Sequence, residues 1–373
     1  MRIFVPSAAT LLTDRAGHGE GLIAWGILSG LAARGHELVV CAERSNLSSP
    51  PPFQLHETGR ASRLESLAPL VQARNARRLL ERLGGSGRFD LVHWLFPQQP
   101  EEAVFAAPAD LPVIVGPLFA PWPSGSRARP LRPGDAVRGA IRPLLHARHR
   151  RLLRASLALL ATPDAARPGV VRSRVLGPGV DAARFSASPP ADGSRILFVG
   201  TLERAKGVRD LVEAFAQLRR ARPEAELVLA GDGPDRTWID DARTRLGLNG
   251  SLRLVGPVSH AEVPALLAGS TLFCLPSHGE PYGMAVVEAM AAGRAVVGTD
   301  TGGPRHLVDR EHGGRLVPAG DPAALAGALA ELLDDRPALA AAGAFNRNRV
   351  EQELGLEPVL DALEDAYDEV TRR

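Results

Sequence analysis

The stretch SHGEPYGMAVVEAMAAG carries two glutamates, Glu280 and Glu288, eight residues apart. Glu280 follows the apolar run TLFCLPS and lies in a loop, whereas Glu288 lies in a helix that we expect to begin near Gly283. The free amides at the start of that helix and the positive end of the helix dipole form a site for an anion. Carboxylates that accept hydrogen bonds from hydroxyls, beside amides that hold phosphate, suit a sugar joined to a nucleotide diphosphate.

A second residue suited to chemistry is Lys206, in VGTLERAKGV, which is the only lysine among 44 lysines and arginines. Lysine is a compact charge on a flexible stem and arginine is a planar fork, so a tight phosphate site can require the ammonium. The alternative is chance, since a single lysine has to lie somewhere. Its place between an apolar strand and Gly207 favours the chemical interpretation.

Composition limits the classes of function. The chain has 373 residues, of which 45% are hydrophobic and 23% charged, and its net charge of +2 argues against a nucleic-acid partner. Cys41 and Cys274 both lie in apolar runs, so we expect buried, reduced thiols. The start MRIFVPSAAT lacks the features of a signal peptide and no apolar run reaches 18 residues, so we expect a cytoplasmic protein.

The elements that must position these residues alternate between short apolar runs and helical patterns. We expect strands at 2–6, 36–42, 90–96, 112–117 and 157–162, and again at 195–200, 226–231, 252–256, 271–277, 294–299 and 314–319. Helical patterns between them include Glu20–Arg34, Arg63–Leu83, Val208–Arg222 and Met284–Ala292. Such alternation predicts an α/β protein with parallel sheets, and its two series predict two Rossmann-like, doubly wound domains.

The polar, proline-rich stretch Ser186–Ser194 is the expected join between the two domains. We therefore predict a first domain over 1–187, a second over 188–355, and a C-terminal helix within 356–373 that packs back on the first. Ligands of doubly wound sheets bind at the carboxyl ends of the strands. The loops at those ends are GHGEG, GTLERAKG, AGDGPD and SHGEPYGM, and none of them is a Walker phosphate loop.

Several strings occur together in a specific order: LAARGHELVV, GPGVDAARF, VGTLERAKGV, LAGDGPD, LRLVGPVSHAEVPALLAGS, the Glu280 to Glu288 stretch, AGRAVVGTDTGG and GGRLVPAGDPAALAGAL. Through them the chain resembles, over nearly its whole length, the retaining glycosyltransferases of family 4. The resemblance implies the GT-B fold, in which two Rossmann-like domains face each other across a cleft.

The resemblance also assigns roles to particular residues. Lys206 would contact the donor diphosphate, Glu280 the hydroxyls of the transferred sugar, and Glu288 the ribose. Arg204 is a candidate second cation, with an ordinary exposed arginine as the alternative, and the expected catalytic set is Glu280, Lys206 and Arg204. The implied donor-binding residues are Gly200, Thr201, Lys206, Val255, Gly256, Glu280, Tyr282, Gly283, Met284, Ala285 and Glu288. The implied first-domain residues on the acceptor side are Gly19, Glu20, Gly21 and His93, the last with a structural role as the alternative.

Three positions depart from the family pattern. Thr201 stands where an arginine is frequent, and Arg204 is a candidate to replace that charge. Gly116 stands where many members have a histidine, and His306 where a glutamate is common. Thr201 and Gly116 keep open the alternative of a non-catalytic GT-B subunit that binds a partner. A GT-B nucleotide-sugar epimerase is another alternative, for which the Glu280 to Glu288 stretch is poor evidence.

The resemblance implies transfer of a hexose, with retention, from a nucleotide sugar to an acceptor hydroxyl. A UDP-sugar is the favoured donor and a GDP-sugar the second choice. No cofactor is expected, and no metal, since the chain has no Asp-x-Asp pair. The acceptor, whether a glycan, a lipid-linked molecule or a natural product, is not specified by the sequence.

A basic segment, Arg127–Arg154, contains nine arginines and one acid, with leucines on one side. One interpretation is an interfacial helix that contacts anionic lipid, which would make the protein peripheral at the inner face of the membrane. The other is an ordinary surface helix in an arginine-rich protein. The sequence leaves both open.

Overall fold

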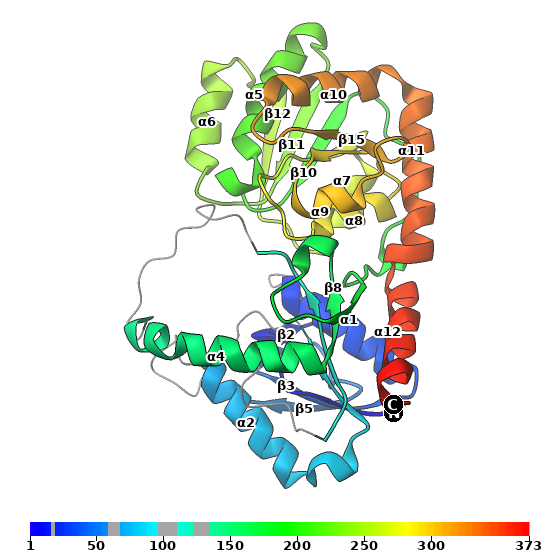
Figure 1. Cartoon of the computed structure of the whole chain (residues 1–373). Helices are drawn as coiled ribbons and strands as arrows, with labels where there is room; N and C mark the ends of the chain where they lie inside the picture. The colour runs from blue at the N-terminus through cyan, green and yellow to red at the C-terminus, as the bar shows by residue number, and fades with distance from the viewer. Residues whose placement is uncertain (16–18, 59–67, 96–109, 122–134, 373) are drawn as a thin grey trace. The chain divides into compact units, whose positions relative to one another are not determined.

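The structure, a computed structural model, describes residues 1–15, 19–58, 68–95, 110–121 and 135–372 (Figure 1). Within these ranges the chain forms two compact units. Of the described residues, the first unit contains those up to Ala120, residues 135–179 and residues 356–372, and the second contains Val180–Gly355. Residues 180–187, which the sequence-based division gives to the first domain, group with the second unit.

The first unit is built on a seven-stranded sheet in the order β5-β3-β1-β6-β7-β8-β9, and every pairing in it is parallel. Its strands are β1 (Arg2–Val5), β3 (Glu37–Ala42), β5 (Gln54–Glu57), β6 (Leu91–Trp94), β7 (Val113–Leu118), β8 (Leu157–Leu160) and β9 (Arg172–Val175), with a separate pair of β2 (Leu11–Thr13) and β4 (Arg44–Asn46). Its helices are α1 (Gly19–Ala33), α2 (Ala68–Arg82), α4 (Asp135–Ala155) and α12 (Leu356–Thr371), with short 3-10 turns at Gly85–Arg88 and Pro163–Ala165.

Both faces of this sheet are covered, which explains why its strands read as continuous apolar runs. Along β1, Ile3 points into a core shared with α1 and α12, whereas Phe4 points into a second core shared with α2. Alternate residues therefore belong to opposite layers, as a doubly wound sheet requires.

The second unit has a six-stranded parallel sheet in the order β12-β11-β10-β13-β14-β15. Its strands are β10 (Arg195–Val199), β11 (Glu226–Ala230), β12 (Leu252–Gly256), β13 (Leu272–Leu275), β14 (Val296–Thr299) and β15 (Gly314–Val317). Its helices are α5 (Val208–Ala221), α6 (Arg236–Arg245), α7 (Val263–Ala268), α8 (Met284–Ala291), α9 (Gly302–Leu307), α10 (Pro322–Asp334) and α11 (Arg336–Arg349); shorter turns are η4 (Ala182–Arg184), η5 (Arg204–Lys206) and the π-helical η6 (Val350–Leu354).

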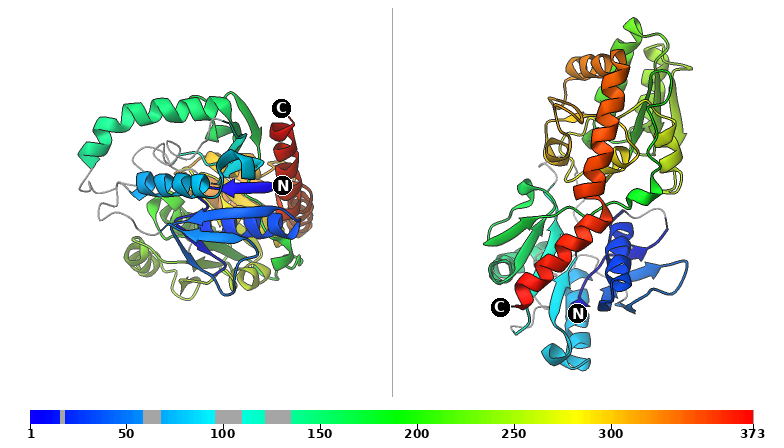
Figure 2. Two further views of the ribbon diagram at one scale, coloured as in Figure 1. Left: turned by 90° about the horizontal axis from the view of Figure 1, so that it is seen from below. Right: turned by 90° about the vertical axis from the view of Figure 1, so that its right-hand side faces the viewer.

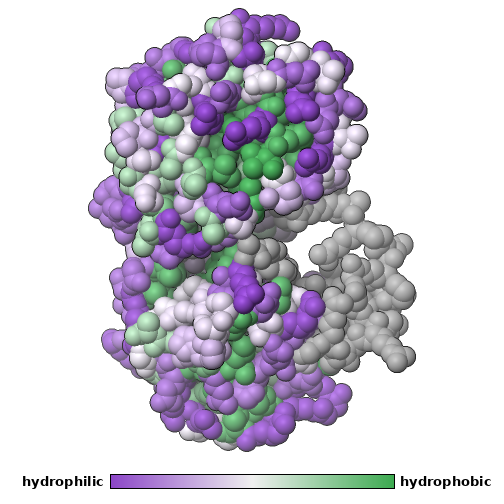
Figure 3. Space-filling model, turned by 180° about the vertical axis from the view of Figure 1, so that it is seen from behind, coloured by the Kyte–Doolittle hydropathy of each residue, from purple (hydrophilic) through white to green (hydrophobic). Residues whose placement is uncertain are grey.

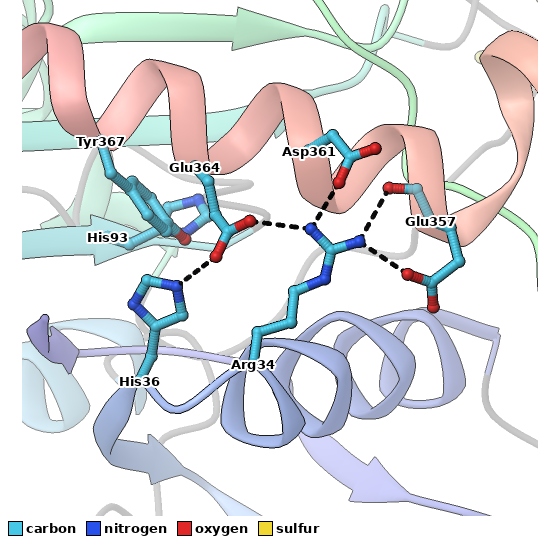
Figure 4. Close-up of polar contacts among 7 residues, drawn as sticks. All are labelled: Arg34, His36, His93, Glu357, Asp361, Glu364 and Tyr367. Carbon is cyan, nitrogen blue, oxygen red and sulfur yellow. Dashed lines mark hydrogen bonds and ion pairs between the residues drawn. The ribbon is translucent and has the colours of Figure 1, made fainter.

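The C-terminal helix α12 returns to the first unit and packs on α1 (Figures 1 and 2). Gly30 of α1 permits this approach, because a Cβ there would lie 2.5 Å from a Leu360 methyl carbon. The contact also has a polar side, in which the Arg34 guanidinium binds three carboxylates of α12 (Figure 4).

Residues 186–194, the expected join, are held firmly within the second unit. The buried Arg294 guanidinium donates to the Pro189 carbonyl at 3.0 Å and also binds Ser188. Arg336 donates to the carbonyls of Ala191 and Gly193 at 3.0 and 3.3 Å. The boundary between the compact units lies instead at Gly179, because these guanidinium bonds tie the proline-rich stretch to the second sheet.

All eleven strands expected from the apolar runs are present, and the helices begin and end within two residues of the sequence patterns where both ends are described. Strands β2, β4, β5 and β9 were not expected. β5 and β9 are edge strands with few fully buried residues, so their sequences, QLHE and RSRV, lack the apolar run that identifies a central parallel strand.

Candidate active site

The candidate site lies at the carboxyl edge of the second sheet, where the strand order reverses between β10 and β13. Neighbouring strands there continue into loops that turn to opposite faces, which leaves a ligand-binding crevice in open α/β sheets. Lys206 follows β10, and Glu280 follows β13. The topology thus brings together two residues that are 74 positions apart in the sequence.

The Lys206 ammonium forms an ion pair with the Glu280 carboxylate. Both side chains are largely shielded, with 16% and 11% of their surface exposed. Burial of a charged group is unfavourable unless the group has a partner of opposite charge. The pair therefore places one positive and one negative group side by side at the strand ends.

Backbone contacts hold the two loops against each other. Gly207 has φ +68°, and a Cβ there would lie 1.8 Å from the Pro276 carbonyl oxygen. The Ala205 carbonyl accepts from the His278 amide and from the Ser277 hydroxyl, both at 2.9 Å. The glycine after Lys206 is thus required by the close approach of the loop that carries Glu280.

Two further glycines support the same loop from the other side. The Gly303 amide donates to the Glu280 carbonyl at 2.7 Å, and a Cβ on Gly303 would lie 1.6 Å from the Tyr282 carbonyl oxygen. Gly302 has φ +54° and would also collide with Glu280. Tyr282 itself is buried, and burial raises the pKa of its hydroxyl. The GTDTGG string therefore shapes the site by close packing.

Helix α8 begins directly after this loop, as expected. Gly283 precedes it in the left-handed region, with φ +103°, and no side chain caps the helix. Met284 and Ala285 are partly exposed at its first turn, whereas the helix behind them is buried. The amino end of α8 thus presents backbone amides beside the Lys206–Glu280 pair.

Glu288, one turn further along α8, binds a residue that the sequence analysis did not single out. His260 Nε2 lies 2.8 Å from Glu288 Oε1, and His260 Nδ1 lies 2.6 Å from Arg184 Nη1. Arg184 ends the turn η4, and His260 precedes α7. No local motif signals this contact, because the three residues lie far apart in the sequence.

A second histidine–carboxylate contact lies beside Lys206. His278 Nε2 is 2.5 Å from Asp210 Oδ2 of α5, and both side chains are partly exposed. The contact ties the Glu280 loop to the helix that follows Lys206. Sequence reasoning missed Asp210 as well, although its place in the first turn of α5 is typical of an acid at a helix start.

The other proposed donor-binding residues lie at the carboxyl ends of β10 and β12. Gly200 and Thr201 follow β10, and Arg204 is exposed in the turn η5. Val255 and Gly256 end the edge strand β12, where Val255 keeps 40% of its surface exposed. Their contacts with a donor stay a prediction.

In the first unit, Gly19, Glu20 and Gly21 open helix α1. Gly21 packs tightly, because a Cβ there would lie 1.9 Å from the Leu11 carbonyl oxygen of β2, whereas a Cβ on Gly19 would meet no atom of the described residues within 4 Å. Burial raises the pKa of the Glu20 carboxyl to about 7. Gly21 therefore has a packing role, and the acceptor-side role of this turn stays a prediction.

His93 lies wholly inside the first unit. Its Nε2 donates to the Gly116 carbonyl at 2.9 Å, and its Nδ1 is 2.7 Å from the Tyr367 hydroxyl of α12 (Figure 4). Burial lowers the pKa of the imidazole to about 4. Both ring nitrogens are occupied inside the unit, which favours the structural alternative for His93. Gly116, with φ +129°, could not carry a histidine here, because its Cβ would lie 2.3 Å from the Leu159 carbonyl oxygen.

The basic segment is described in side-chain detail from Pro143 onward. Leu145 and Leu153 of α4 are buried, whereas Leu144 keeps 66% of its surface exposed beside exposed arginines. Figure 3 shows the face of the molecule opposite to that in Figure 1, on which apolar patches lie between polar residues. Across the described ranges, no helix is both long enough and apolar enough to cross a membrane. Peripheral contact with a membrane stays a prediction.

Two doubly wound domains with this site at the edge of the second define the GT-B fold of glycosyltransferases, and solved structures agree. The chain matches HepE of Anabaena, solved in complex with UDP, with a TM-score of 0.72, 18% identity, and coverage of 99% of this chain and 100% of that one. It matches sucrose-phosphate synthase of Thermosynechococcus elongatus with a TM-score of 0.73, 19% identity, and coverage of 100% and 98%.

The chain belongs to the family of glycosyl transferases group 1, whose model matches residues 180–349. It is 30% identical to a phosphatidyl-myo-inositol mannosyltransferase of Mycolicibacterium smegmatis over 320 residues, which is 81% of this chain and 77% of that protein. It is 35% identical to a glycogen synthase of Mycobacterium tuberculosis over 203 residues. That match covers 54% of this chain and about half, 49%, of the synthase.

Proposed function

We propose that this chain transfers a hexose from a nucleotide-diphosphate sugar to an acceptor hydroxyl and retains the anomeric configuration. The observation that carries the proposal is the Lys206–Glu280 pair at the strand-order reversal, next to the uncapped start of α8. Family membership supports it. UDP is the first nucleotide to test, because structural neighbours of the same fold were solved with UDP and UDP-glucose; GDP is the second.

In this proposal the positive groups stabilise the leaving diphosphate. The Lys206 ammonium exchanges part of its contact with Glu280 for a contact with a phosphate oxygen. The backbone amides of Gly283, Met284 and Ala285 donate hydrogen bonds to other oxygens of the diphosphate. Arg204, exposed two residues before Lys206, adds the cation that Thr201 does not supply. Fixed positive groups of this kind do the electrostatic work without a metal ion.

The carboxylates bind hydroxyls in the same proposal. Glu280 accepts from hydroxyls of the transferred sugar and orients it, and Glu288 accepts from the ribose. The acceptor oxygen attacks the anomeric carbon on the face from which the diphosphate departs, and a phosphate oxygen takes the acceptor proton. The new glycosidic bond then has the configuration of the broken one.

The acceptor is not assigned. A relative is named for a mannosyl transfer to phosphatidyl-myo-inositol, so a lipid-linked acceptor at the inner face of a membrane is one class to test, beside glycans and natural products. The exposed Leu144 and the arginines of α4 would form the contact with such a membrane.

The test is incubation of the protein with UDP-glucose and GDP-mannose, with measurement of released UDP or GDP. Slow hydrolysis of one donor in the wild type, and its loss in Lys206→Ala, supports a transferase. Proton NMR of a transfer product then reports the anomeric configuration, and an inverted linkage would refute retention. A sugar epimer without transfer would indicate an epimerase, and nucleotide binding without any turnover would indicate a non-catalytic subunit.

A further inference from the structure

Three residues of the second unit form a hydrogen-bonded series that ends at Glu288. Arg184 Nη1 lies 2.6 Å from His260 Nδ1, Arg184 Nη2 donates to the His260 carbonyl at 3.3 Å, and His260 Nε2 lies 2.8 Å from Glu288 Oε1. The Arg184 guanidinium thus holds the histidine by both its ring and its backbone. We call these residues the Glu288 relay.

The relay fixes where the histidine proton lies. A guanidinium has only donors, so the nitrogen that faces Arg184, Nδ1, must be the acceptor. The ring proton therefore lies on Nε2 and points at Glu288 Oε1. A histidine whose tautomer is set by a second partner is a directional donor, which orients the group that it binds.

Hydrogen bonds hold the turn η4, which carries Arg184, in place. The turn η4 begins with an Asp181 carboxylate that accepts from the Ala183 amide at 3.1 Å. Arg347 donates to the carbonyls of Ala182 and Phe185 at 3.2 and 2.6 Å. Arg184 is therefore anchored on both sides before it reaches His260.

At the other end of the relay, Glu288 lies in a buried stretch of α8 with 10% of its side chain exposed. Its Oε1 is engaged by His260, and within the described ranges no hydrogen bond reaches Oε2. Holding one carboxylate oxygen fixes the direction in which the other accepts. One oxygen is thus held by the protein, and the other is directed toward a ligand hydroxyl.

We propose that His260, fixed by Arg184, is a positioning residue that aims Glu288 at a ribose hydroxyl and makes the site select ribonucleotides over deoxyribonucleotides. The inference rests on the proposed function, because it needs a nucleotide donor. His260 does not touch the reacting atoms. It acts through the carboxylate, since a hydroxyl-binding group that is correctly aimed discriminates strongly against an analogue that lacks the hydroxyl.

The experiment is calorimetric titration of UDP, 2′-deoxy-UDP and 3′-deoxy-UDP, with the GDP series in parallel, into the wild type, His260→Ala and His260→Gln. We expect the wild type to bind UDP or GDP about tenfold or more tightly than one of its deoxy forms. We expect His260→Ala to reduce that ratio to about threefold or less while it still binds the diphosphate, and His260→Gln, which keeps an amide donor, to restore part of it.

His312→Ala is the matched control, because His312 also contacts a carboxylate, Asp309, at 3.2 Å, but its side chain is 61% exposed at the surface. It should leave every ratio unchanged. A wild-type ratio that survives in both His260 variants would overturn the inference and leave the proposed function intact. A wild type that binds ribo and deoxy forms equally would overturn both the inference and the assignment of Glu288 to the ribose, but not the proposed sugar transfer. Failure of the wild type to bind either diphosphate would overturn both proposals. If His260→Ala does not fold, His260→Gln carries the comparison.

Discussion

Two of the cation–carboxylate contacts in the described part of the chain differ in surroundings more than in chemistry. In the first unit, the Arg34 guanidinium contacts Asp361, Glu364 and Glu357 at 2.6, 2.8 and 2.6 Å, all on one stripe of α12 (Figure 4). In the second unit, the Lys206 ammonium contacts Glu280 at the carboxyl ends of two strands. The first cluster joins a helix to a helix, and the second lies where a doubly wound sheet binds ligands.

If the proposed function holds, position in the fold is what separates the structural cluster of Arg34 from the functional pair of Lys206 and Glu280. A planar guanidinium suits several fixed carboxylates at once, whereas an ammonium can exchange one oxygen for another with little change of geometry. Arg34 therefore matches a permanent contact with a helix. Lys206 matches a contact that a diphosphate can share.

The largest expected effect is loss of transfer in Lys206→Ala. Removal of one cationic contact with the leaving diphosphate should cost about 2–4 kcal/mol in the transition state, or roughly 30- to 1000-fold in kcat/KM. The free energy of unfolding should also fall, because the shielded Glu280 carboxylate is left without its partner, so the loss of turnover is measured at a temperature at which the variant is folded. Unchanged turnover at both saturating and limiting donor would exclude the assignment.

The next largest effect is a loss of stability in acid, which tests the contact of His93 with Tyr367 of α12. His93 is neutral in the folded protein, since burial lowers its pKa from 6.5 to about 4. The unfolded chain binds its proton first as the pH falls, so stability should decrease between pH 6.5 and pH 4, by about 2 kcal/mol at pH 5. Urea unfolding at pH 7 and pH 5 measures this loss.

The matched comparison for that loss uses His93→Gln and His312→Gln. The first should reduce the difference in unfolding free energy between pH 7 and pH 5, and the second, on an exposed histidine, should not. An undiminished difference in His93→Gln would show that another group causes the acid sensitivity.

Lys206→Arg should give a smaller but definite loss. The guanidinium keeps the charge but is wider, and the close approach of Gly207 to Pro276 leaves little room at the strand end. We expect kcat/KM to fall about tenfold, with the donor KM affected first. Full activity in this variant would mean that the charge alone matters and that the single lysine is an accident.

The smallest effect is expected from Arg34→Gln. Its three carboxylate partners are between 37% and 76% exposed, so loss of the network should cost about 1 kcal/mol of unfolding free energy. Arg77→Gln, which breaks an exposed pair with Glu81 at 2.9 Å, is the matched control and should cost less. UDP binding should be unchanged in both. Equal stability losses would remove the distinction between this cluster and an ordinary surface pair.

The sequence predicts where the candidate site residues of the second unit lie, because their positions follow from the order of the strands. Lys206 and Glu280 each follow a strong apolar run, and the parallel arrangement of those runs places both at one edge of the sheet. The uncapped start of α8 could be predicted for the same reason, since Gly283 ends the loop.

The remaining features depend on contacts between distant residues. The Glu288 relay uses side chains from the turn η4, the loop before α7 and the helix α8, and nothing in VSHAEV marks His260 as the partner of Glu288. Arg294 cannot be distinguished from other arginines in an arginine-rich chain, yet it secures the stretch that looks like a linker. His93 has the sequence context of a site residue, and only the return of α12 reveals its bond to Tyr367.

The most direct test of the central claim is calorimetric binding of UDP and uridine, or of GDP and guanosine, to the wild type and Lys206→Ala. If Lys206 holds the diphosphate, the substitution should weaken binding of the nucleoside diphosphate by about tenfold or more and leave binding of the nucleoside unchanged. Equal affinity of the two proteins for the diphosphate would contradict the account.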